Sequence, residues 1–157
     1  NALPPTPAIG LLQAPASWQT VDLISDLHLQ ASETATFEAW RQYMATTPAQ
    51  AVLLLGDLFE VWVGDDAAKT HVFLQQCASV LKNCASSRHV AFMRGNLDFL
   101  VGTDFLNACD VHNLQDPMVL RFAYKDGFCR TVMQVVWAMS ITKLSGAWFD
   151  NHFGKRN

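Results

Sequence analysis

The sequence predicts an α/β fold in which parallel strands alternate with helices. Three short apolar runs of strand length recur along the chain, and segments with helical periodicity separate them. The order strand–helix–strand–helix–strand predicts parallel strands joined by right-handed crossovers. Half of the 157 residues are hydrophobic and only 16% are charged, so the chain can form one domain with a buried core.

The first elements are expected between the N-terminus and Pro48. Residues 1–19 are rich in proline and predict an irregular N-terminal arm. Residues 20–26, TVDLISD, predict a short strand. Residues 34–47 predict a helix that Pro48 stops, and its apolar side chains share one face: Phe37, Trp40 and Met44.

The later elements continue the same alternation. Residues 51–55, AVLLL, form the continuous apolar run expected of a strand buried on both faces. Residues 89–93 predict the third strand, residues 102–110 a short helix, and residues 117–123 a fourth strand. Residues 67–87 predict one long helix whose inward face is Phe73, Cys77, Val80, Leu81 and Cys84.

Charge and cysteine content narrow the possible functions. The net charge of −3 provides no electrostatic basis for binding nucleic acid. The four cysteines have no CxxC spacing, which argues against a zinc knuckle or a redox motif. Scattered cysteines are consistent with reduced thiols in a cytoplasm.

Polar residues follow each of the first three predicted strands. In parallel α/β sheets the carboxyl ends of the strands meet at one edge, where ligands bind. Carboxylate, carboxamide and imidazole groups together suit an Mn-like or Fe-like divalent ion. A carboxylate between two such ions would bridge them, and the pair would lower the pKa of a bound water to about 7 for phosphoryl chemistry. The residues are Asp26 and His28 in SDLHL, Gly56 and Asp57 in GDLFE, and Gly95, Asn96 and Asp98 in GNLDF.

Each of these residues also has an ordinary structural interpretation. Taken alone, Asp26 is typical of a turn or a helix cap, and His28 of a surface or hydrogen-bonded histidine. Gly-Asp and Gly-Asn are common turn sequences after a strand. Their joint occurrence at the ends of three successive strands favours the metal site.

The three motifs resemble the first three sequence blocks of the calcineurin-like metallophosphoesterases. The longer runs GDLFEVWVGDD and GNLDFLVGTDF resemble, more narrowly, the UDP-2,3-diacylglucosamine hydrolases of lipid A biosynthesis. Those enzymes cleave a pyrophosphate bond to release UMP and 2,3-diacylglucosamine 1-phosphate. The resemblance covers roughly residues 20–123 and implies the N-terminal portion of an α/β/β/α sandwich.

The resemblance also implies roles for individual residues. Asp26 and His28 would bind the first metal, Asp57 would bridge the two metals, and Asn96 would bind the second metal and contact the substrate. The expected cofactor is a pair of Mn²⁺ ions that activate water, so no protein residue is expected to be the nucleophile. The intact enzyme would act on a lipid-linked UDP-sugar while peripherally attached to the cytoplasmic face of the inner membrane. No nucleic-acid partner is implied, and the oligomeric state stays open.

Two further acidic residues and one departure concern the substrate. Asp65 and Asp66 would lie near the nucleotide-lipid substrate, although a plain acidic turn explains them as well. The family usually has arginine where this chain has Leu97. An arginine can hold phosphate oxygens bidentately, whereas leucine cannot, so substrate binding would be altered here.

The later family blocks, His-Gly-Asp and Gly-His-x-His, do not occur in the sequence. Back-translation of residues 124–157 with permissible synonymous codons, read two bases along, yields a hidden His-Gly-Asp at the expected place, followed by a cap-like segment. We therefore expect residues 124–157 to be an out-of-frame, non-family tail, which sequencing of the gene across codon 123 would test. An ordinary divergent C-terminal segment is the alternative.

Two other functions stay open from the sequence. One is a different metal-dependent phosphoesterase, such as a phosphodiesterase for a soluble nucleotide. The other is a non-catalytic, truncated product that binds metal weakly or not at all. Because several metal ligands of the family are missing, we expect the 157-residue chain by itself to be impaired or inactive.

Overall fold

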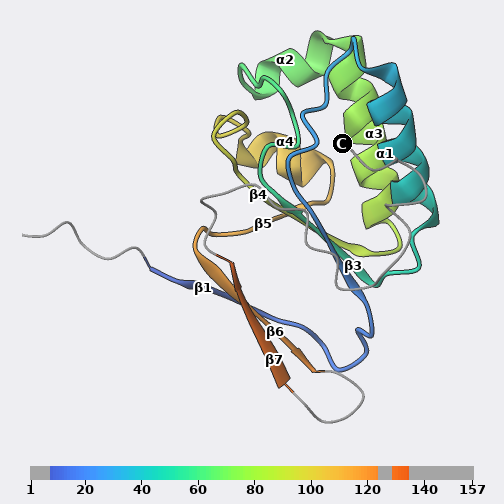
Figure 1. Ribbon diagram of the computed structural model, residues 1–157. Helices are drawn as coiled ribbons and strands as arrows, with labels where there is room; N and C mark the ends of the chain where they lie inside the picture. Colours follow the sequence, from blue (N-terminus) through green and yellow to red (C-terminus); the bar gives the residue numbers. More distant parts are fainter. Residues whose placement is uncertain (1–7, 124–128, 135–157) are drawn as a thin grey trace, which may run out of the picture.

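The computed structural model describes residues 8–123 and 129–134 and arranges them in three layers (Figure 1). A four-stranded parallel sheet lies between a layer of helices and a second, three-stranded sheet. The parallel sheet has the order β2 (Val21–Ile24), β3 (Ala51–Leu55), β4 (His89–Met93) and β5 (His112–Asn113). The helices are α1 (Thr34–Thr46), α2 (Asp65–Thr70), α3 (Val72–Ala85) and α4 (Thr103–Ala108). The second sheet has the order β1 (Gly10–Gln13), β6 (Met118–Ala123) and β7 (Cys129–Gln134).

The predicted α/β class with parallel strands is confirmed. The strands expected at 20–26, 51–55 and 89–93 form β2, β3 and β4, which pair in parallel. The helix expected at 34–47 forms α1. The described residues thus contain a helical layer and two sheet layers, which fits the N-terminal portion of the α/β/β/α sandwich that the resemblance implies.

β3 is the centre of the core because all five of its residues are buried. Val52 and Leu54 face the helices, whereas alternate residues face the second sheet, as the two-residue period of a strand requires. On the helical side, Trp40 and Met44 of α1 are buried, and the predicted inner face of α3 contributes three buried side chains: Cys77, Leu81 and Cys84. A strand buried on both faces explains why the run AVLLL shows no polar alternation.

The helix predicted at 67–87 is instead two helices that meet at His71. His71 has an extended backbone (φ −87°, ψ 115°), which ends α2 and begins α3. The start of α2 is held by the Asp65 carboxylate, which accepts hydrogen bonds from the Gly102 and Phe105 N–H groups at the start of α4. The periodicity of residues 67–87 does not reflect these hydrogen bonds to residues distant in the chain, and so the sequence predicts a single helix.

The strand expected at 117–123 is confirmed as β6 (Met118–Ala123), which belongs to the second sheet, whereas β5 is the fourth strand of the parallel sheet. The expectation of an irregular arm over residues 1–19 was wrong in part. Gly10–Gln13, in the predicted irregular arm 1–19, forms β1 and pairs in parallel with β6. The physical reason is burial: Met118 and Leu120 of β6 pack against the face of the parallel sheet that the helices leave uncovered.

Part of the predicted tail 124–157 also pairs with this sheet. Residues 129–134 form β7, antiparallel to β6. The other tail positions lie outside the described residues, so the proposed change of reading frame stays a prediction. Within the described part of the chain, no helix combines the length and the apolar character needed to cross a membrane.

Two histidines stack at the start of β4. The rings of His89 and His112 are 4.3 Å apart and nearly parallel, and Trp18 packs on His89 at 4.9 Å. Burial, and secondarily the neighbouring His112, lower the pKa of His89. A lowered pKa means that the unfolded chain binds this proton more tightly than the folded chain does. The stability that neutral His89 contributes is therefore lost as pH falls below its unfolded pKa of about 6.5.

We expect acidification to destabilise the wild-type chain more than a His89→Gln variant. The measurement is the urea-derived free energy of unfolding at about pH 7.5 and about pH 5.5, taken as the difference between the two pH values. His71→Gln is the control, because His71 is exposed and lies outside the stack. Equal losses for wild type and His89→Gln would contradict the expectation.

Candidate metal centre

The site lies just beyond the ends of β2 and β3. The chain segments that follow these two strands remain hydrogen-bonded to each other through their backbones. This extended pairing sets the segment after β2 directly against the segment after β3. It therefore places the SDLHL motif alongside the GDLFE motif. The hydrogen bonds run from Asp26 N–H to Gly56 O (3.1 Å), His28 N–H to Asp57 O (3.0 Å) and Leu29 N–H to Leu58 O (2.8 Å).

Three predicted metal ligands converge at this edge of the sheet. One potential ligand atom from each of Asp26, His28 and Asp57 lies within 4.8 Å of the others, and all three residues are half-buried. Two carboxylates and one imidazole are a mixed oxygen and nitrogen donor set that fits an Mn-like or Fe-like divalent ion. The structure thus brings these residues together, as the strand order predicts.

The same three residues have an unusual backbone conformation. Asp26, His28 and Asp57 have φ angles of 55°, 51° and 51°, in the left-handed region. For residues other than glycine this conformation costs about 1–3 kcal/mol each and persists only where the surrounding structure holds it. Such strain is concentrated at functional sites. Its occurrence at all three positions of the group supports a functional role.

The segment after β4 is held against Asp57. The Leu97 N–H donates to Asp57 Oδ1 at 2.9 Å. A Cβ atom on Gly95 would lie 2.2 Å from the same oxygen, so only glycine allows this approach. Asn96 lies between these two contacts in the chain, and it is exposed. The structure thus places the Asn96 backbone beside Asp57, while metal binding by its side chain stays a prediction.

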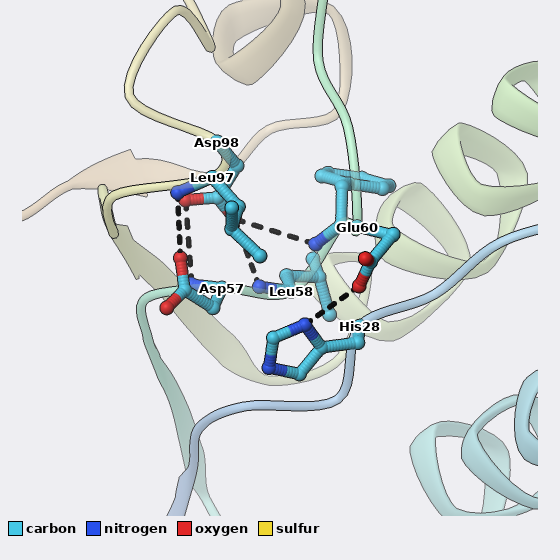
Figure 2. Close-up of polar contacts among 7 residues, drawn as sticks. His28, Asp57, Leu58, Glu60, Leu97 and Asp98 are labelled. Carbon is cyan, nitrogen blue, oxygen red and sulfur yellow. Dashed lines mark hydrogen bonds and ion pairs between the residues drawn. The ribbon is translucent and has the colours of Figure 1, made fainter. Parts of the chain in front are cut away.

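Asp98 joins the segments after β3 and β4 (Figure 2). Its side chain is completely buried. Burial raises the pKa of Asp98, the backbone N–H groups of Gly95, Phe59 and Leu58 lower it, and the nearby Asp57 carboxylate raises it. Four backbone N–H groups point to the Asp98 carboxylate: those of Gly95 (2.7 Å), Leu58 (2.8 Å), Asp57 (3.3 Å) and Phe59 (3.4 Å). Asp98 thus positions Asp57 through the backbone.

Glu60 is a contact of the site that the sequence reasoning missed. Its Oε2 lies 2.7 Å from His28 Nδ1 (Figure 2). The available signal was its position three residues after Asp57 within GDLFE, at the end of the same motif. The side chains of Glu60 and His28 are 44% and 41% exposed, so their contact is not part of the buried core.

Asp65 and Asp66 do not belong to the group of possible metal ligands. Both oxygens of Asp65 are engaged: Oδ1 accepts from Gly102 N–H at 2.8 Å, and Oδ2 accepts from Phe105 N–H at 2.9 Å. Asp66 is paired with Lys69 at 2.8 Å, and this contact lowers the pKa of its carboxyl group. Asp65 thus stabilises the packing of α2 on α4, and the predicted contact of both residues with substrate stays a prediction.

Comparisons with known proteins confirm the resemblance seen in the motifs. Curated proteins named UDP-2,3-diacylglucosamine hydrolase match this chain, including one from Shewanella pealeana at 39% identity over 88 residues, which are 55% of this chain and 36% of that protein. One from Stutzerimonas stutzeri is 40% identical over 103 residues (63% and 42%), and one from Ralstonia nicotianae is 35% identical over 118 residues (69% and 44%). The chain thus spans less than half the length of these relatives.

The chain was also compared with family models and with solved structures. No family model matches the chain. Among solved structures, the crystal structure of Pseudomonas putida nuclease MPE is similar with a TM-score of 0.46 and 16% sequence identity, over 80% of each chain.

Proposed function

We propose that this chain carries part of the metal centre of a hydrolase that cleaves the pyrophosphate bond of UDP-2,3-diacylglucosamine. The observation that carries the proposal is the convergence of Asp26, His28 and Asp57 within 4.8 Å at the end of two parallel strands. The names of the curated relatives support the substrate, a lipid-linked UDP-sugar. The products would be UMP and 2,3-diacylglucosamine 1-phosphate.

The chain's own residues would hold and orient the reacting groups. Asp26 and His28 would hold a first divalent cation, Asp57 would supply a ligand shared with a second, and Asn96 would hold the second cation and contact a substrate oxygen. When bound, the cations, which we propose to be Mn²⁺, would neutralise phosphate oxygens and lower the pKa of the attacking water. Hydrogen bonds from Leu97 N–H to Asp57, and from Asp57 N–H to Asp98, hold the bridging carboxylate in place.

The remaining features of the proposal concern the surroundings of the site. Asp65 and Asp66 lie on the substrate side, and the intact enzyme contacts the cytoplasmic face of the inner membrane peripherally. We place the family-like domain at residues 20–123 and the out-of-frame tail at 124–157; the matched share of the chain, 55–69%, is compatible with this division. Among the described residues only His28 supplies an imidazole to the group, so we expect slow turnover or none.

Binding of Mn²⁺ tests the proposal directly. We expect the wild-type chain to bind Mn²⁺ in a titration followed by the electron paramagnetic resonance signal of free Mn²⁺. Asp57→Asn should weaken this binding at least about tenfold, because it removes a charged ligand from the group. Asp104→Asn is the control, since Asp104 is exposed on α4. Equal affinity of Asp57→Asn and wild type, or no binding by wild type, would overturn the proposed site.

Substrate specificity is tested separately by release of UMP. Any Mn²⁺-dependent turnover should be faster with UDP-2,3-diacylglucosamine than with a generic phosphodiester. The opposite preference would favour a phosphodiesterase for soluble nucleotides. Rapid turnover by this polypeptide would contradict the expectation that it is impaired.

A further inference from the structure

We infer that Glu60 is a positioning residue of the metal centre: its carboxylate accepts the Nδ1–H of His28 and so leaves Nε2 of His28 as the ligand atom. The two side-chain atoms lie 2.7 Å apart. This inference rests on the proposed function, because it assigns the free ring nitrogen to the divalent cation.

The direction of the hydrogen bond follows from the chemistry of the two groups. An ionised carboxylate can only accept hydrogen bonds, so Nδ1 of His28 must be the donor. A neutral imidazole has one N–H and one lone pair, which therefore lies on Nε2. Figure 2 shows Nε2 on the side of the ring away from Glu60. A histidine that binds a metal commonly donates its other N–H to a carboxylate in this way.

The backbone explains why Glu60 reaches His28. Glu60 N–H donates to Leu29 O at 3.1 Å, which continues the pairing between the segments after β2 and β3. Its neighbour Phe59 forms a parallel bridge with Leu29 and is completely buried. Glu60 is thus anchored directly across from the residue that follows His28. The pair is set by the same backbone pairing that brings Asp26 and Asp57 together.

The contact has little structural value on its own. Ion pairs between exposed side chains contribute little to stability, and both partners are more than 40% exposed. Removal of the Glu60 carboxylate should therefore leave the fold intact while it changes the tautomer of the His28 ring. This separation makes the inference testable in the metal-free chain.

The first measurement is the tautomer of His28. Long-range ¹H–¹⁵N correlation spectra of the metal-free chain distinguish Nδ1–H from Nε2–H; His28→Gln assigns the signals. We expect mostly Nδ1–H in wild type and in Glu60→Gln, whose amide oxygen accepts the same bond. Glu60→Ala should shift the population towards Nε2–H. Glu38→Ala is the matched control, because Glu38 is an exposed glutamate paired with Arg41 instead.

The second measurement is Mn²⁺ affinity. Glu60→Ala should weaken binding about 10–100-fold, the usual effect of losing a residue that orients a metal ligand. Glu60→Gln should recover most of this loss, and Glu38→Ala should match wild type. Thermal midpoints should agree among all four proteins, which would exclude misfolding as the cause.

Three results would overturn the inference. One is an unchanged His28 tautomer in Glu60→Ala, and another is Mn²⁺ affinity of Glu60→Ala within twofold of wild type. The third is an equal loss in Glu60→Gln and Glu60→Ala, which would make Glu60 a charged ligand rather than a positioning residue. If wild type binds no Mn²⁺, the proposed function fails, and the tautomer alone decides whether Glu60 orients His28.

Discussion

Asp98→Ala is expected to lower the free energy of unfolding by about 3 kcal/mol or more. The Asp98 carboxylate is completely buried and accepts short hydrogen bonds from Gly95 N–H (2.7 Å) and Leu58 N–H (2.8 Å). Each buried donor left without a partner costs about 1–3 kcal/mol. The loss is large beside a typical total stability of about 5–15 kcal/mol.

Urea denaturation followed by circular dichroism measures this loss. Asp104→Ala is the matched control; Asp104 is exposed in the first turn of α4, where a carboxylate contributes at most about 1 kcal/mol. A loss below about 1 kcal/mol for Asp98→Ala would contradict the expectation. Because Asp98 also holds the segments that carry Asp57 and Asn96, Mn²⁺ affinity should fall even where the variant remains folded.

Phe59→Ala is expected to destabilise the fold by about 3–5 kcal/mol, as is typical of truncating a buried phenylalanine. The side chain is completely buried. Its ring lies 4.7 Å from that of Trp62 and 6.1 Å from that of Phe105, measured between ring centroids. Truncation would leave a cavity where the segment after β3 packs on α4.

The thermal midpoint and the urea midpoint measure this loss. Phe99→Ala is the control, because Phe99 is 60% exposed and should change stability by only about 0.5 kcal/mol. Similar losses in the two variants would contradict the burial that the structure shows. Phe59 lies between Leu58 and Glu60, so its truncation should also loosen the contact between Glu60 and His28.

The candidate site was predictable to the extent that it depends on strand ends. Asp26, His28 and Asp57 follow apolar runs, and parallel pairing alone brings the ends of those runs together. The contact between Glu60 and His28 was not predictable from periodicity, since it depends on backbone pairing beyond the last residue of each strand. The four N–H groups around Asp98 were hidden for a related reason, because three of them come from residues about forty positions away.

The sequence by itself determined the order of β2, α1, β3 and β4 along the chain and the sheet edge at which their polar residues gather. Hydrophobic periodicity and the order of elements along the chain are local properties, so the sequence alone is enough to predict them. Only the tertiary structure decided that the predicted helix 67–87 breaks at His71 and that β1 joins β6 in a second sheet. It also decided the left-handed backbone at Asp26, His28 and Asp57. These features depend on contacts between residues distant in the chain. The energies of such contacts cannot be predicted from a local sequence pattern.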